Sequence, residues 1–258
     1  MLYFFIGLLA SIFGALAGLG GGIIIKPVLD FFGHYEVTTI GILSAATVFS
    51  MACVSLLTSI KSDVKIHLKS SFLIAIGSIT GGVIGKLLFN YIVRIIGISD
   101  VITVFQDGII AILMVVIFIL VKNKEKTSYK VDSQCLILVI GFILGMIAAF
   151  LGIGGGPFNV AILALFFSMG AREAALNSIF IIFFSQLSSL LFTTFTTGFS
   201  DLDLTMLPYM IVGGMLGGFL GSLFSKKVNN QFVEKIFKVG IIAIISVNIY
   251  NIVRYFFY

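Results

Sequence analysis

The stretch "LGIGGGPFN" at residues 151–159 interrupts a long apolar run with four glycines and a proline. A second stretch of the same kind, "GLGGGIIIKP", occupies residues 18–27. Three consecutive glycines close to a proline lose too much helix propensity and too many hydrogen bonds to continue as regular helix. The sequence therefore predicts two apolar segments, each broken into a pair of shorter helical arms.

The composition is that of an integral membrane protein. Of the 258 residues, 59% are hydrophobic and 10% are charged, and the mean hydropathy is +1.19, whereas a soluble domain carries about 25% charged residues. Helices satisfy their own backbone groups in lipid, and alternating β-barrel segments are not evident. The predicted fold class is therefore an all-α membrane protein. Apart from the two broken segments, long spans are predicted near residues 37–60, 69–92, 100–121, 172–196, 204–224 and 235–254.

The two glycine clusters belong to an internal repeat. An offset of 134 residues places Gly18, Gly20, Gly21 and Gly22 on Gly152, Gly154, Gly155 and Gly156. Further along, glycines spaced four apart recur in both halves, where small residues let helix backbones approach closely; they are Gly77, Gly81, Gly85, Gly213, Gly217 and Gly221. The sequence predicts a first transmembrane repeat at 1–121, a cytoplasmic linker at 122–134 and a second repeat at 135–258.

Loop charges predict that the two repeats have opposite orientations in the membrane. The loop that carries Lys61, Lys65 and Lys69 corresponds to one with Asp201 and Asp203. Because Lys and Arg in short loops prefer the cytoplasm, equivalent loops should lie on opposite sides. This arrangement places twelve of the sixteen basic residues in cytoplasmic loops and both termini outside. Inverted repeats of this kind are common among secondary transporters.

The glycine breaks are the candidate substrate site. Unwound backbone within a membrane must be buried in protein or line a cavity, and free N–H groups at a helix N-terminus favour an anion. A purely structural hinge is the alternative. A nucleotide-phosphate loop fits poorly, because neither cluster follows a predicted strand or continues into Gly-Lys-Ser/Thr. The candidate backbone positions are Gly20, Gly21, Gly22, Gly154, Gly155 and Gly156.

Polar side chains inside the apolar spans near the breaks complete the candidate site, since each needs a partner or a cavity. They are Lys26, Thr47, Thr58, Asn159, Asn177, Ser178, Gln186 and Ser189. Thr47, Ser55 and Thr58 share their spacings with Ser178, Gln186 and Ser189, which suggests matched positions in the two halves. For any single hydroxyl, bonding back to its own helix is the more common alternative.

Three charged residues lie within or near the spans. Lys26 either attracts an anion or extends to the outer membrane interface, and we favour the interface; Lys86 is expected to extend there too. Asp107 is close enough to its helix end to reach water, with a proton relay as the alternative. No catalytic, metal-binding or cofactor-binding constellation is evident, so an enzyme is not expected. The net charge of +5 follows from the short loops and does not indicate nucleic acid.

The paired "GLGGGIIIKP" and "GIGGGPFN", each in a half-length repeat with short charged loops, resemble the sulfite exporter TauE/SafE family of bacterial membrane transporters. The resemblance covers essentially the whole chain. It implies a multi-pass protein of a prokaryotic cell membrane. It also implies a sulfur-containing substrate such as sulfite, thiosulfate or a sulfonate.

The expected function is secondary transport of a small anion by alternating access at a site between the two breaks. The expected partners are that anion, the lipid bilayer and a coupling proton or other ion. An anion channel and a non-transporting membrane scaffold are the competing hypotheses.

Overall fold

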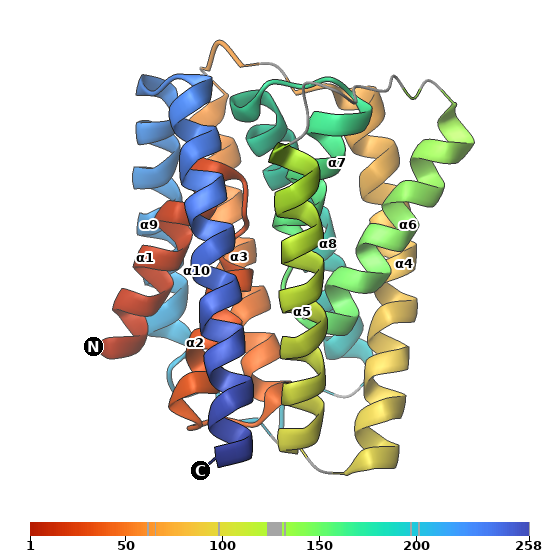
Figure 1. Cartoon of the computed structure of the whole chain (residues 1–258), viewed down its shortest axis with the longest axis vertical. Coiled ribbons are helices and arrows are strands. Elements are labelled where there is room, and N and C mark those ends of the chain that lie inside the picture. Colours follow the sequence, from red (N-terminus) through yellow and green to blue (C-terminus); the bar gives the residue numbers. More distant parts are fainter. Residues whose placement is uncertain are drawn as a thin grey trace.

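A computed structural model describes the chain except for Lys61, Lys65, Ile98, residues 123–130, Asp132, Thr197, Asp201 and Tyr258. The loop charges at Lys61, Lys65 and Asp201, and most of the predicted linker, thus lie outside the described residues. The described chain folds into helices without strands (Figure 1). They are α1 (Leu2–Ala17), α2 (Gly22–Phe32), α3 (Val37–Ser59), α4 (Leu68–Ile96), α5 (Ser99–Lys122), α6 (Gln134–Leu151), α7 (Gly156–Phe166), α8 (Ala171–Thr196), α9 (Leu207–Lys227) and α10 (Asn230–Phe257).

The all-α membrane fold is confirmed. Seven of the described helices, α3 to α6 and α8 to α10, are long and apolar enough to cross a bilayer. The six predicted long spans correspond to α3, α4, α5, α8, α9 and α10. The two glycine-broken segments are also observed, because α1 and α2 are separated at residues 18–21 and α6 and α7 at residues 152–155.

Two pairs of helices make close backbone contacts, α1 with α9 and α4 with α6. A Cβ atom added to Gly81 of α4 would lie 1.9 Å from the Phe142 carbonyl oxygen of α6, and one added to Gly217 of α9 would lie 2.5 Å from the Leu8 carbonyl oxygen of α1. The glycines spaced four apart therefore serve helix packing, as predicted. We call these two contacts the glycine seams.

The equivalent helices α5 and α10 lie side by side and run in opposite directions. Figure 1 shows α5 ending at the upper end of the bundle, where α10 begins, and α10 descending to the C-terminus at the lower end. The two short arms make equivalent contacts, since α2 packs against α10 and α7 packs against α5.

Residues near both termini contact the connection from α2 to α3. The Tyr3 hydroxyl is 2.7 Å from His34 Nδ1, and the Arg254 guanidinium donates to the Phe31 carbonyl oxygen. At the opposite end, Lys226 Nζ donates to the Thr58 carbonyl oxygen over 2.6 Å, and the end of α9 thus meets the end of α3.

Candidate functional site

The two glycine breaks pack directly against each other. A Cβ atom added to Gly156 would lie 1.9 Å from the Leu19 carbonyl oxygen, and one added to Gly22 would lie 2.9 Å from the Ile153 carbonyl oxygen. The offset of 134 residues relates Leu19 to Ile153 and Gly22 to Gly156. The two contacts are thus reciprocal, and the breaks meet around a local pseudo-twofold relation.

The backbone of each break takes conformations that favour glycine. Six glycines have φ between 68° and 81°, in the left-handed region that L side chains rarely adopt; they are Gly18, Gly20, Gly21, Gly152, Gly154 and Gly155. Each break leads straight into a new helix, α2 at Gly22 and α7 at Gly156. The first N–H groups of a helix have no partner four residues back; in α2 Gly22 and Ile24 donate to the Gly20 and Gly21 carbonyl oxygens, and in α7 Pro157 has no N–H.

Ser178 of α8 connects the two breaks. Its buried hydroxyl lies 2.8 Å from the Gly18 carbonyl oxygen of the first break and 3.3 Å from the Gly156 carbonyl oxygen of the second. One hydroxyl proton is thereby shared between the two halves of the chain.

The equivalent residue in the first half is Ser44, which the sequence analysis missed. Ser44 is buried, and its Oγ would lie 3.0 Å from a Cβ atom added to Gly22. The predicted pairing of Thr47 with Ser178 was wrong, because it shifted the register by three residues. The offset of 134, continued from the glycines into α3 and α8, pairs Ser44 with Ser178 and would have identified it.

Two predicted amides lie at the second break. Gln186 Nε2 would be 2.9 Å from a Cβ atom added to Gly154, and Asn159 Nδ2 would be 3.7 Å from one added to Gly155. Both residues are buried. Ser189 is half-buried and follows Gln186 by three residues on α8.

Thr47 and Thr58 point elsewhere. Thr47 Oγ1 donates to the Leu43 carbonyl oxygen of its own helix over 2.7 Å, and Thr58 Oγ1 donates to Val54 in the same way. The Thr47 methyl group faces α9, 3.0 Å from a Cβ atom added to Gly214. These hydroxyls bond back to their helix, as the alternative interpretation stated, and we remove both residues from the site.

Asn177 also faces away from the breaks, toward the start of α4. Its Oδ1 accepts hydrogen bonds from the His67 amide at 2.8 Å and the Ser71 hydroxyl at 2.6 Å, and its Nδ2 donates to the Glu173 carbonyl oxygen at 2.8 Å. The amide thus fixes the connection from α3 to α4 onto α8.

Lys26 does not extend to the membrane interface, so the favoured interpretation was wrong. The side chain is 1% exposed, and Nζ donates to Asp30 Oδ2 over 2.9 Å. Its Cδ and Cε atoms would lie 3.7 Å from a Cβ atom added to Gly152, so the stem runs along the second break. The lysine is enclosed because α2 packs against α10, and its carboxylate partners satisfy its charge inside the protein.

Lys86 and Asp107 are likewise buried, contrary to expectation. Lys86 is 8% exposed and its Nζ lies 5.1 Å from the centroid of the Phe89 ring. The Asp107 side chain is 1% exposed, and its Oδ1 lies 3.9 Å from Lys26 Nζ. Position near a helix end left neither side chain exposed, because neighbouring helices cover both.

Comparison with known proteins agrees with this architecture. The family model described as "Sulfite exporter TauE/SafE" matches residues 3–248. The chain belongs to this family. The "Probable membrane transporter protein YunE" of Bacillus subtilis (strain 168) is 25% identical over 265 residues, which cover 93% of each chain. The "Probable membrane transporter protein MJ0441" of Methanocaldococcus jannaschii is 28% identical over 163 residues, which cover 62% of this chain and 60% of that one.

Membership of the TauE/SafE family and the seven apolar helices make the chain a multi-pass membrane protein of a transporter family. Within that family assignment, the site that the described residues bring together consists of the two breaks with Ser44, Ser178, Gln186 and Asn159. Lys26 adds a buried positive charge beside it.

Proposed function

We propose that this TauE/SafE protein is a secondary transporter of a small anion. The proposed substrate is a sulfur-containing anion such as sulfite, thiosulfate or a sulfonate. The substrate class rests on the family description, which names sulfite export. The membership of a transporter family favours transport over a scaffold role, and the names of the two relatives agree.

The observation that carries the proposal is the reciprocal contact of the two breaks at Gly22 and Gly156. It brings two helix N-termini to one place, where N–H donors and the positive end of the helix dipole favour an anion. Gln186, Asn159 and the two serines add neutral donors around them. Neutral donors that converge on one point suit an oxyanion that must also be released.

The tight packing at the breaks supports alternating access. The Ile182 Cδ1 atom would lie 2.8 Å from a Cβ atom added to Gly20, and the Leu19 carbonyl oxygen closes on Gly156. An anion can occupy this place only when the two breaks separate. The opposite directions of α5 and α10 support inverted repeats at 1–121 and 135–258, an architecture in which one part moves against another around a fixed site.

Transport in liposomes tests the proposal. Purified protein should exchange labelled sulfite or thiosulfate against unlabelled anion in a saturable counterflow. We expect Gln186→Leu to lower this exchange by about tenfold or more, because an amide at the break is lost and an apolar group replaces it. The matched control is Thr194→Val on the same helix, whose exposed hydroxyl bonds back to the Leu190 carbonyl oxygen and should not affect exchange.

Two results would contradict the proposal. Flux that rises linearly with anion concentration and shows no counterflow would indicate a channel. No flux together with no binding of any anion tested would instead favour a scaffold role.

We also propose an orientation of the protein in the cell membrane, based on its basic residues. Both termini meet the connection from α2 to α3, and we place this end outside because the other end carries Lys226, Lys227 and Arg172. A reporter that is active only in the cytoplasm should therefore stay inactive when fused after the C-terminus. The same reporter inserted between residues 123 and 130 should be active, and the reverse pattern would overturn the orientation.

A further inference from the structure

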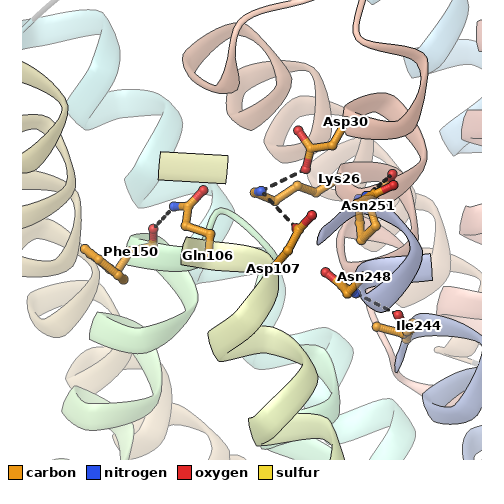
Figure 2. A network of polar contacts seen from close by, with 9 residues as sticks. Lys26, Asp30, Gln106, Asp107, Phe150, Ile244, Asn248 and Asn251 are labelled. Atoms are coloured by element: carbon orange, nitrogen blue, oxygen red, sulfur yellow. Dashed lines mark hydrogen bonds and ion pairs between the residues drawn. The ribbon is translucent and has the colours of Figure 1, made fainter. Parts of the chain in front are cut away.

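A buried charge cluster joins the short arm α2 to the long helix α5. Figure 2 shows Lys26 between Asp30 of its own helix and Asp107 of α5. Lys26 Nζ lies 2.9 Å from Asp30 Oδ2 and 3.9 Å from Asp107 Oδ1, and the three side chains are 1% to 2% exposed. The cluster is thus closed to water at its centre, and its charges must balance within the protein.

Within its enclosed part, which excludes the exposed Arg254 at the cavity mouth, the cluster has balanced charges only if it binds one more positive charge. One ammonium faces two carboxylates, so the fully ionised cluster carries a net negative charge, which is costly to bury. Lys26 hydrogen-bonds to Asp30 and only approaches Asp107. Neither carboxylate oxygen of Asp107 has a donor at good hydrogen-bond geometry among the described residues, and the nearest polar side chain is that of Asn251. Of the two carboxyl groups, Asp107 is therefore the one expected to bind the additional positive charge.

The groups that face Asp107 from α10 suit a protonated carboxyl. The side-chain oxygens of Asn248 and Asn251 accept no hydrogen bond from the described part of the chain, while their Nδ2 atoms donate to the carbonyl oxygens of Ile244 and Pro27. Figure 2 shows both amides beside Asp107. Asn251 thus offers the carboxyl an acceptor oxygen that has no donor among the described residues, and a protonated carboxyl is a donor.

The neighbouring charged and polar groups lie at the rim of the cluster or face away from it. Arg254 and Tyr255 of α10 lie at the mouth of the cavity beside Asp107, and Arg254 donates to the Phe31 carbonyl oxygen. From α4, Lys86 stacks over Phe89 and does not line this cavity. Gln106 turns the other way, toward α6, where its Nε2 donates to the Phe150 carbonyl oxygen.

A cavity gives the carboxyl a route for exchange. It measures about 410 Å³ and is lined by Asp30, Thr103, Asp107, Asn251, Arg254 and Tyr255. It lies at the end of the bundle where the C-terminus is found, because Arg254 and Tyr255 belong to the last turn of α10. On its inner side the cluster reaches the second glycine break through the Lys26 stem beside Gly152.

The corresponding place between α7, α5 and α10 has no buried charge cluster among the described residues, since the carboxylate on its wall, Glu234, is 42% exposed and pairs with Lys238. A small cavity there is lined by Val160 and Ala164 of α7, which the offset of 134 pairs with Lys26 and Asp30, and by Val121 and Phe237. The charge cluster is therefore an addition to one half of the repeat. It is not part of the helix packing that the two halves share.

We propose that Asp107 binds the proton that couples anion transport to a proton gradient, with Lys26 and Asp30 as its charge-balancing pair. This inference rests on the proposed function. When the cluster is closed, as here, the carboxyl holds a proton. When separation of the two breaks moves Lys26 on α2, the carboxylate pairs with the lysine and the proton leaves to water.

Flux measurements on Asp107→Asn test the proposal, because asparagine keeps the size of the protonated carboxyl and its ability to donate a hydrogen bond but cannot release a proton. In liposomes the variant should keep anion counterflow, which needs no net proton movement, within about twofold of the unaltered protein. It should lose about tenfold or more of the anion accumulation driven by an imposed pH gradient. Asp203→Asn is the control, since that carboxylate lies in an exposed connection and bonds only to Thr205.

The outcomes separate this inference from the proposed function. If the unaltered protein shows no counterflow, the proposed function fails. If it shows counterflow and Asp107→Asn still accumulates anion under a pH gradient, the proton site fails alone. Loss of counterflow in a variant with an unchanged thermal midpoint would also overturn the proton site and place Asp107 in anion binding. Accumulation driven by a sodium gradient, with no response to pH, would replace the proton by sodium.

Discussion

Replacing Gly156 with alanine is expected to destabilise the protein and abolish most of its transport. The new methyl group would lie 1.9 Å from the Leu19 carbonyl oxygen, and the close packing of the two breaks leaves neither backbone free to move away. Overpacking of this kind costs about 1–3 kcal/mol, and contact with backbone places the change at the upper end. The thermal midpoint of the purified protein and the counterflow rate should both fall.

Two companion variants show whether the effect comes from contact between the breaks. Gly22→Ala meets the Ile153 carbonyl oxygen at 2.9 Å and should cost less than Gly156→Ala. Gly108→Ala, within α5, meets no described atom within 4 Å and should be neutral or stabilise by about 0.5–1 kcal/mol. Equal thermal midpoints for the Gly156 and Gly108 variants would show that the breaks do not touch in the working protein.

Replacing Lys26 with methionine is expected to have the second large effect. The change removes the only ammonium between Asp30 and Asp107 in the described cluster and leaves the buried Asp30 carboxylate without a counter-charge. Removing one partner of a buried ion pair costs about 3–5 kcal/mol. The thermal midpoint should fall accordingly, and the double change Lys26→Met with Asp30→Asn should restore much of it.

Lys238 provides the matched control. It pairs with Glu234 at the same spacing of four residues and over 2.7 Å, but the two side chains are 34% and 42% exposed. An exposed pair of this kind contributes about 0.3–0.5 kcal/mol, so Lys238→Met should change the midpoint little. Similar losses for Lys26→Met and Lys238→Met would mean that the Lys26 pair is open to water.

Much of the fold could be predicted from the sequence because its signals are local. Apolar length gave the long helices, the glycine clusters gave the separation of α1 from α2 and of α6 from α7, and the four-residue glycine spacing gave the seams. Each of these follows from backbone geometry or from the solvent in which a helix lies. None requires knowledge of which helices are neighbours.

The side chains of the site were harder to predict because their roles depend on neighbouring helices. Thr47 lies on α3, yet its methyl group faces α9, and Asn177 serves the start of α4. Lys26 and Asp107 are 81 residues apart, so their pairing could not be inferred from spacing along a helix. Ser44 was within reach of the sequence, since the repeat offset already pointed to it.

The glycine seams limit how this transporter can move. Backbones in direct contact along α1 and α9, and along α4 and α6, leave no side chains to rearrange, so we expect each pair to behave as one stiff plate. The short arms α2 and α7 are not part of either glycine seam, and each is connected to the preceding helix through glycines at positive φ. We therefore expect the two eleven-residue helices α2 and α7 to move relative to the stiff helix pairs. Helix α2 carries Lys26 and Asp30, and α7 begins at Gly156, where the anion is proposed to bind.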